Sequence, residues 1–269
     1  MIVADWVDEA LRAALCEAGL DTVDGAFAFA AGEELDKPGL AGRRRTRLEL
    51  TDANGRRHEL YLKRYPRERA PARLRRAWTH GCGRGPARVE YDNIRAAQAA
   101  GVPTMRAVAC GQRRGRSWLI VTAVPGEALE RCVEDVLAAD DAEEMSRRLA
   151  ASLGRLAATL HGAGWVHRDL YASHVFLDAG GAGTDLYLID LARMFRPRWR
   201  RRRWIVKDLA ALRYSMPREW VNARWAELLA AYAPRASDGE RGSLDAAVRR
   251  KTRRIARHAE RKRAREHGE

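Results

Sequence analysis

Residues 165–193 hold two aspartates whose positions suit the transfer of a phosphoryl group. Asp169 lies in a His-Arg-Asp-Leu turn, and Asp190 follows the apolar run at 186–189. The segment between them predicts a strand, a glycine-rich turn and a second strand, so that one acid lies at each end of a hairpin. Phosphoryl transfer uses such a pair, because one carboxylate orients the attacking hydroxyl or receives its proton while the other holds a metal ion on the phosphates.

Two more charged residues precede this stretch in the order found in protein-kinase active sites. Lys63 lies in a predicted strand over 58–65, and Glu90 lies in the first turn of a predicted helix over 87–100. In the protein-kinase signature, a strand lysine bridges the ATP phosphates and a helix glutamate, ahead of His-Arg-Asp and a metal-binding Asp. Taken singly, a solvated lysine and an acid at a helix N-terminus are ordinary features. Taken together, the ordered set predicts a kinase that uses ATP and Mg2+.

The signature predicts a role for each of these residues, with one departure among the metal ligands. Asp169 is the predicted catalytic base and Asp190 the predicted ligand of Mg2+. Lys63 is expected to act in catalysis and, with Glu90, to bind the nucleotide. His174 stands where the signature has a metal-binding Asn. Because magnesium prefers oxygen, His174 is a doubtful ligand and the number of metal ions stays open.

The residues around the strands indicate where the nucleotide would bind. Alternating polar and apolar residues predict strands over 45–50, 58–65, 103–110 and 117–123, in a sheet of five strands, with a hairpin turn at 52–55. Val121 and Ala123 fall in the expected hinge, where backbone groups can bind adenine. Residues 37–43 are where a phosphate-covering loop would lie, but their few glycines suit an ordinary surface turn equally well.

Helical patterns surround and follow this sheet. Helices are expected over 5–19, 140–162 and 220–232, and the second of them is long. The sequence therefore predicts an α+β, two-lobed protein-kinase-like fold, with a small antiparallel β-sheet N-lobe and a mainly helical C-lobe. The predicted boundaries are 1–124 for the N-lobe with its N-terminal helix, 125–240 for the C-lobe and 241–269 for a basic helical tail.

The 269-residue chain is strongly basic, with 50 Lys and Arg against 36 Asp and Glu and a net charge of +14. Such a charge attracts nucleic acid, an anionic membrane or a phosphorylated substrate without choosing among them. The four cysteines form no CxxC pair, so a reducing cytoplasm is expected and neither a disulfide framework nor a zinc site. No signal peptide is expected, and no apolar run approaches the roughly 18 to 20 residues of a transmembrane segment.

Three basic segments are candidates for contact with an anionic partner. Residues 66–86 are either a solvated linker or an arm that touches the substrate. The tail at 244–269 is expected to be a surface-binding or partly disordered extension, and nucleic acid is an unlikely partner because no recognised motif accompanies it. The run at 195–204 contains two tryptophans, which favour a membrane interface or sugar stacking over a merely solvated face. Candidate contacts to substrate or membrane are Arg193, Arg196, Arg198 and Trp199.

Several short motifs together resemble the lipopolysaccharide kinase (Kdo/WaaP) family of the kinase-like superfamily. The motifs are Tyr-Leu-Lys-Arg-Tyr at 61–65, Arg-Val-Glu-Tyr at 88–91, His-Arg-Asp-Leu-Tyr with His174 at 167–174, Leu-Ile-Asp-Leu-Ala-Arg at 188–193 and Lys-Asp-Leu-Ala-Ala-Leu at 207–212. His174 in place of Asn is similar to this family, as is Asp-Leu in place of Asp-Phe-Gly. His167 and Asp208 are expected to support the catalytic turn.

The resemblance implies a kinase that phosphorylates an inner-core sugar, heptose or Kdo, of lipopolysaccharide or a lipid A-core precursor. It implies a cytoplasmic enzyme, peripheral at the inner membrane and bound to its anionic surface. Two alternatives stay open: a protein or small-molecule kinase of the same fold, and a non-catalytic basic scaffold or nucleic-acid-binding module.

Overall fold

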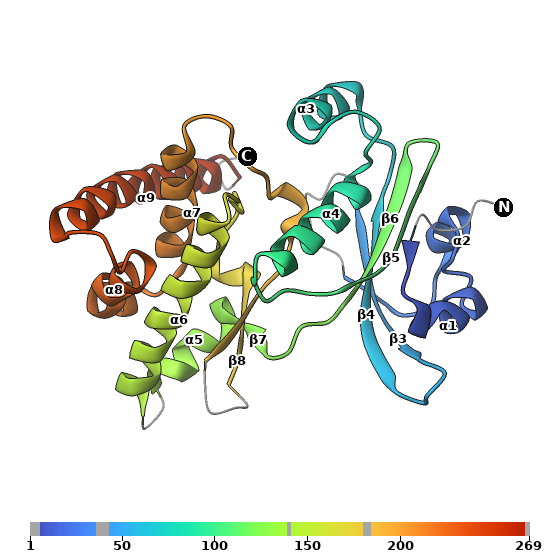
Figure 1. The fold of residues 1–269 in the computed structure, drawn as a ribbon, viewed down its shortest axis with the longest axis horizontal. Coiled ribbons are helices and arrows are strands. Elements are labelled where there is room, and N and C mark those ends of the chain that lie inside the picture. Colours follow the sequence, from blue (N-terminus) through green and yellow to red (C-terminus); the bar gives the residue numbers. More distant parts are fainter. Residues whose placement is uncertain (1–5, 36–42, 139–140, 180–183, 267–269) are drawn as a thin grey trace. The chain divides into compact units, whose positions relative to one another are not determined.

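The computed structural model describes residues 6–35, 43–138, 141–179 and 184–266 (Figure 1). The chain divides into two compact units. The first consists of Met1–Ala99 and Thr104–Val124, and the second of Ala100–Pro103 and Pro125–Glu269. The first unit is built on an antiparallel sheet and the second is mainly helical, as the sequence predicted. The phosphate-covering loop considered at 37–43 lies almost entirely outside the described residues.

The sheet of the first unit has six described strands rather than the expected five. Their order is β1-β5-β6-β4-β3-β2, and every neighbouring pair is antiparallel. The two edge strands have only two residues each, too short to produce an alternating sequence pattern. The strands are β1 (Trp6–Val7), β2 (Glu33–Glu34), β3 (Arg44–Thr51), β4 (Arg57–Tyr65), β5 (Ala107–Arg113) and β6 (Arg116–Thr122).

Helices cover both faces of this sheet, and the alternation of side chains along β4 decides what each face receives (Figure 1). Leu60 and Leu62 are fully buried in a core cluster with residues of α1 (Arg12–Glu17) and α2 (Val23–Ala28). Lys63 points to the opposite face, where α4 (Pro86–Ala99) packs. The helix predicted over 87–100 is therefore confirmed, whereas the one expected over 5–19 is shorter and follows an edge strand.

Residues 66–86 contain a helix, α3 (Ala70–His80), that the sequence did not predict. Pro71 stands in its first turn, where a missing N–H costs nothing. Gly81 follows its last residue with a φ of 91°, a conformation that ends the helix at glycine. The proline, the glycines and the dense arginines indicated a linker or an arm, and they hid the helix-forming Ala, Leu and Arg residues between them.

The second unit combines a small sheet with five α-helices among its described residues. Two helices approach closely at Gly154, because a Cβ atom there would lie 2.5 Å from the carbonyl oxygen of Leu228. The sheet order is β7-β8-β9, and all pairs are antiparallel. The elements are β7 (Glu127–Ala128), α5 (Leu129–Ala138), α6 (Ala142–Gly162), β8 (Val175–Asp178), β9 (Asp185–Leu188), α7 (Arg201–Ser215), α8 (Arg218–Tyr232) and α9 (Asp238–Glu266).

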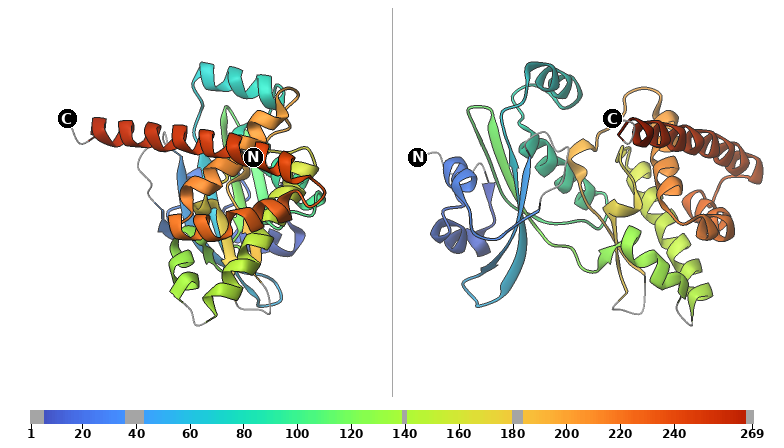
Figure 2. Two further views of the ribbon diagram at one scale, coloured as in Figure 1. Left: turned by 90° about the vertical axis from the view of Figure 1, so that its left-hand side faces the viewer. Right: turned by 180° about the vertical axis from the view of Figure 1, so that it is seen from behind.

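The basic tail is helical, as the sequence predicted, and its described residues belong to one continuous helix, α9. Ser237 and Glu240 form a capping box at its start, where the Ser237 amide donates to the Glu240 carboxylate at 2.8 Å. Val248 is fully buried, and the Trp225 indole donates to Asp245 at 2.9 Å. Figures 1 and 2 show α9 packed against α7. Packing thus orders a segment whose composition alone suggested disorder.

None of the helices in the described part of the chain combines the length and the apolar character that crossing a bilayer requires.

Candidate active site

Lys63 and Glu90 form a buried ion pair in the first unit. The Lys63 ammonium contacts Glu90 Oε1, and the Tyr65 hydroxyl donates to Glu90 Oε2, so both carboxylate oxygens are used. The Lys63 side chain is 10% exposed and the Glu90 side chain is fully buried. Alternation along β4 places Lys63 and Tyr65 on the face that α4 covers. The pairing that the sequence predicted is present, and the arrangement fixes one positive charge on a rigid strand.

The expected hinge residues lie at the end of β6, in the same unit. Val121 is buried and pairs with both neighbouring strands, opposite Tyr61 and Ala107. The amide of Ala123 donates to the Glu59 carbonyl at 2.9 Å. That amide is therefore used within the sheet, and adenine binding by Val121 and Ala123 stays a prediction.

In the second unit, Asp208 holds the His-Arg-Asp turn by its backbone. Its Oδ2 accepts from the His167 amide at 2.6 Å, and its Oδ1 accepts from the Arg168 amide at 2.7 Å. Asp208 is fully buried, about two turns into α7, so the turn is fixed to the helical core. Arg168 has a left-handed backbone with a φ of 75°, which is uncommon for a residue with a Cβ atom. Two strong hydrogen bonds that one carboxylate accepts from the backbone offset the cost of that conformation.

Asp169, the predicted base, lies beside two cations from other segments. Arg193 Nη1 is 2.8 Å from Asp169 Oδ2 and 2.9 Å from Oδ1. Lys207 Nζ is 3.9 Å from Asp169 Oδ1 and also donates to the carbonyl of Arg168. Burial lowers the pKa of Lys207, and Asp169 opposes that shift. The Asp169 side chain is 20% exposed, so it combines a fixed orientation with access from solvent.

His174 joins the catalytic turn to Asp190. Its Nδ1 lies 2.7 Å from the Asp169 carbonyl oxygen. Because a carbonyl can only accept, Nδ1 carries the proton, and the other ring nitrogen faces Asp190 Oδ2 at 3.8 Å. The Ile189 amide also donates to the His174 carbonyl at 2.9 Å. Asp190 itself has a left-handed backbone, with a φ of 58°, which turns the chain sharply after the strand.

His167 supports the same junction from inside the core. Its Nε2 donates to the Ile189 carbonyl at 3.0 Å, one residue before Asp190. Burial lowers its pKa, although Asp208 nearby raises it in part. The ring is therefore a neutral cross-link between the turn that carries Asp169 and the strand that ends at Asp190, as expected for a supporting residue.

The donor set around Asp190 fits magnesium held jointly with phosphate oxygens. Within the described residues, no group of three or more His, Cys, Asp or Glu side chains is arranged to bind a metal ion. Magnesium commonly takes only one or two protein carboxylates and completes its shell with water and substrate phosphates. Asp190 supplies hard oxygens of this kind, 26% exposed. His174 would offer magnesium only a nitrogen, which this ion takes poorly, so His174 suits the role of a positioning group better than that of a ligand.

The predicted contact residues beyond Asp190 have different surroundings. Arg193 lies against Asp169, as described above. Arg196 stacks over the Trp165 ring and donates to the Ala163 carbonyl at 2.9 Å. Arg198 is exposed, and Trp199 is 78% exposed. Their contact with substrate or membrane stays a prediction.

Sequence reasoning missed several groups that complete the site. It assigned no role to the Lys207 ammonium, although the neighbouring Asp208 was singled out. It did not place Tyr65 on Glu90, which the alternation of β4 could have indicated because residues 63 and 65 share a face. It also missed Ser215, whose hydroxyl accepts from the Ala172 amide at 2.7 Å. These contacts join residues 25 to 43 positions apart in the chain, and no short motif contains both partners.

The fold is that of the phosphotransferases that resemble protein kinases. The structure entitled aminoglycoside-3'-phosphotransferase of type VIII aligns with 90% of this chain and 98% of its own, with a TM-score of 0.50 and 17% identity. A closer match is a structure of WaaP in complex with acyl carrier protein, with a TM-score of 0.66, 25% identity, and coverage of 95% of this chain and 99% of that one.

The chain belongs to the lipopolysaccharide kinase (Kdo/WaaP) family, whose model matches residues 36–232. It is 35% identical over 139 residues to the lipopolysaccharide core heptose(I) kinase WaaP of Pseudomonas aeruginosa. That match covers 48% of this chain and 52% of the relative, so it spans about half the length of the relative. The resemblance inferred from the short motifs is thereby confirmed at the level of the family.

Proposed function

We propose that this chain is an ATP-dependent kinase that phosphorylates a sugar hydroxyl, on heptose or Kdo, in the lipopolysaccharide core. The observation that carries the proposal is the placement of Asp169 and Asp190 at the two ends of one hairpin in the second unit. Hydrogen bonds of Asp208, His167 and His174 hold that arrangement. Family membership and the relative named a heptose(I) kinase support the sugar acceptor.

In the proposed reaction, Asp169 accepts a hydrogen bond from the acceptor hydroxyl and orients its oxygen toward the γ-phosphate. Catalysis of this kind depends mainly on positioning and on charge stabilisation. Lys63, fixed by Glu90, contributes positive charge to the nucleotide phosphates. Asp190 would hold Mg2+, which when bound neutralises charge on those phosphates. The cations Arg193 and Lys207 keep the Asp169 carboxylate in one orientation.

The decisive test is phosphate transfer from labelled ATP to purified lipid A-core, detected by mass spectrometry. Asp169→Asn is expected to slow transfer by about a hundredfold to ten-thousandfold, the range for loss of a general base. Asp185→Asn, an exposed aspartate in the same hairpin, is the matched control and should retain activity. Transfer at the wild-type rate by Asp169→Asn would reject the site, and transfer to protein but not to core lipid would favour the alternative of a protein kinase.

We also propose that the chain acts at the cytoplasmic face of the inner membrane, where α3 binds the anionic surface. Leu74 is 75% exposed and Trp78 is 82% exposed, four residues apart on one side of α3. Arg69 and Arg73 are exposed nearby, and a basic helix with a tryptophan suits a lipid headgroup layer. The helix is anchored by Arg76, which donates to Glu68 at 2.5 Å and 2.9 Å.

Vesicle co-sedimentation tests this membrane contact. Leu74→Ser combined with Trp78→Ser is expected to reduce binding to phosphatidylglycerol vesicles at least about tenfold, since burying each side chain contributes roughly 1.5–3 kcal/mol. Trp199→Ser removes the other highly exposed tryptophan and serves as the comparison. If only Trp199→Ser weakens binding, the membrane contact belongs to residues 195–204 and not to α3.

A further inference from the structure

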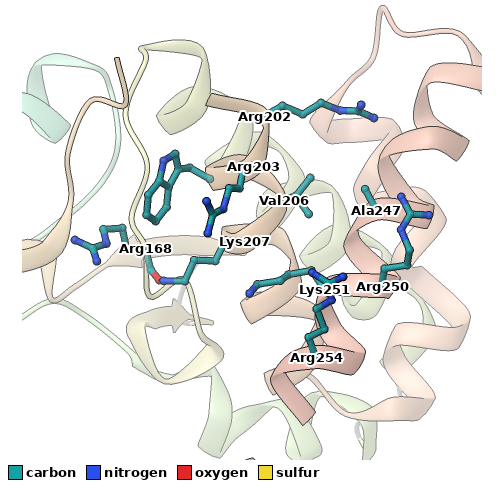
Figure 3. A pocket seen from close by; sticks show the side chains of 10 residues that line it. Arg168, Arg202, Arg203, Val206, Lys207, Ala247, Arg250, Lys251 and Arg254 are labelled. Carbon is teal, nitrogen blue, oxygen red and sulfur yellow. The ribbon is translucent and has the colours of Figure 1, made fainter. Parts of the chain in front are cut away.

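A basic pocket of about 700 Å³ lies between α7 and α9, within the second unit (Figure 3). Seven of its ten lining residues are arginine or lysine, and none is acidic. Figure 3 shows Arg168 and Lys207 on one side of it and Arg250, Lys251 and Arg254 of α9 on the other. The apolar part of the wall includes Trp204 and Val206. Neither the proposed catalytic roles nor the membrane contact accounts for this pocket.

Helical spacing alone brings the α9 cations into the pocket. Positions 247, 250, 251 and 254 follow the i, i+3, i+4, i+7 rule and therefore share one face of a helix. That face turns toward α7, because the neighbouring positions on α9 are in contact with the core. Val248 is fully buried, and the Thr252 hydroxyl lies 3.4 Å from the carbonyl oxygen of Ala210 in α7. The packing of α9 against α7 therefore places these α9 cations on one wall of the pocket.

The three pocket cations that α9 supplies have no acidic partner in the described part of the chain, in contrast to Arg241 and Arg249 of the same helix. Arg241 pairs with Asp238 at 2.5 Å, and Arg249 pairs with Asp245 at 2.6 Å. Within the described part of the chain, no carboxylate lies within 4 Å of Arg250, Lys251 or Arg254. Like charges one turn apart on a helix destabilise it. An anion that enters the pocket would remove that repulsion, so the pocket is complementary to a negatively charged group.

The pocket also adjoins the catalytic turn. Lys207 lines it, donates to the Arg168 carbonyl and lies 3.9 Å from Asp169. The Arg168 guanidinium stacks over the rings of Phe195 and Trp204, at 5.5 Å and 5.4 Å, which fixes it on the pocket wall. A group bound here would therefore lie close to the hydroxyl that Asp169 orients.

We propose that this pocket binds a phosphate group already carried by the acceptor, so that the enzyme acts on a phosphorylated glycan. Arginine forks match phosphate oxygens in pairs, and the Trp204 ring offers a face for the attached sugar. The inference rests on the proposed kinase function, because it assigns the pocket to the acceptor of that reaction. It adds the requirement that the acceptor carry an anionic group, which the pocket recognises, next to the reacting hydroxyl.

The test compares two double variants of the full chain that lose the same charge from the same helix. Arg250→Gln with Arg254→Gln removes two pocket cations, whereas Arg253→Gln with Arg257→Gln removes two exposed ones outside the pocket. The probes are a delipidated, phosphate-bearing core oligosaccharide and the same oligosaccharide after its phosphates are removed. Calorimetry gives Kd for each, and steady-state transfer gives KM and kcat.

We expect the pocket variant to raise Kd and KM for the phosphorylated oligosaccharide by about tenfold or more, as for lost hydrogen bonds to a charged group. The kcat, the Kd for the dephosphorylated oligosaccharide and all values of the control variant should stay within about twofold. If both variants bind the phosphorylated oligosaccharide equally weakly, the loss reflects net charge and not the pocket, and the proposal is overturned. Loss of binding to phosphatidylglycerol vesicles, with oligosaccharide binding intact, would assign the pocket to lipid headgroups and also overturn it.

Calorimetry separates this proposal from the proposed function. If wild-type protein transfers no phosphate to any core acceptor, yet only the pocket variant loses affinity for the phosphorylated oligosaccharide, the kinase assignment fails and the phosphate site stands. If transfer proceeds and the pocket variant has unchanged Kd and KM, the phosphate site fails and the kinase assignment stands.

Discussion

Glu90 and Asp169 each form an ion pair with a basic side chain, but the first pair is buried and the second is exposed to solvent. Glu90 is fully buried and its partner Lys63 is 10% exposed. Asp169 is 20% exposed and its partner Arg193 is 52% exposed. Separating a buried pair leaves a charge without solvation, whereas an exposed pair exchanges with water at little cost. The first pair is therefore a fixed part of the frame, and the second is a contact that a substrate can replace.

The largest expected effect comes from breaking the buried pair. Lys63→Met leaves the Glu90 carboxylate buried beside Tyr65, which should cost about 3–5 kcal/mol of unfolding free energy and abolish measurable transfer. Chemical denaturation and the transfer assay measure the two effects separately.

Adding Glu90→Gln to Lys63→Met separates the effect of Lys63 on stability from its effect on phosphate transfer. The double variant removes the stranded charge, so most of the stability should return while transfer stays lost. Recovery of transfer together with stability would show that Lys63 matters only for folding, and the proposed nucleotide role would then be wrong.

An intermediate effect is expected at Asp208, which is buried like Glu90 but holds backbone amides instead of a cation. In Asp208→Asn, the NH2 group of the new side chain would face one backbone N–H of the turn, so that N–H would lose its acceptor. The unfolding free energy should fall by about 1–3 kcal/mol. The kcat should fall with little change in KM for ATP, because the turn that carries Asp169 loses its support. A loss of stability with unchanged kcat would contradict this positioning role.

The smallest effect is expected at the exposed pair. Arg193→Gln should change the unfolding free energy by less than about 1 kcal/mol. Transfer should fall less than about tenfold, since Lys207 still lies beside Asp169. A loss as large as that of Asp169→Asn would mean that Arg193 contacts the phosphate or the acceptor directly, as the sequence suggested, and the contrast between the two pairs would disappear.

The sequence was informative where chemistry depends on residues close together in the chain. The His-Arg-Asp turn, the hairpin after it and the strand position of Lys63 were all predictable from local pattern. Glu90 was predictable as the partner of Lys63 from the order of the motifs, although it lies one turn into α4 and not in the first turn that the sequence suggested. Strong alternation and recognisable turns account for this success.

The sequence was less informative where tertiary contacts decide. Helix α3 was hidden by flanking proline and glycine, and the order of α9 depends on burial of Val248 against neighbouring helices. The cations beside Asp169 come from residues 24 and 38 positions further along, and the left-handed backbone at Asp190 helps to bring Arg193 there. Long-range proximity of this kind leaves no periodic signal, so only the folded chain reveals it.

The length of α9 has a consequence for how fast partners arrive. At about 1.5 Å per residue, its 29 residues extend roughly 40 Å. Figure 2 shows its C-terminal part continuing past the other helices of its unit, and that part is rich in arginine. A protruding row of positive charge enlarges the target that a diffusing polyanion can encounter and guides it along the row. Rates of association with anionic ligands should therefore fall steeply as ionic strength rises, even where dissociation rates change little.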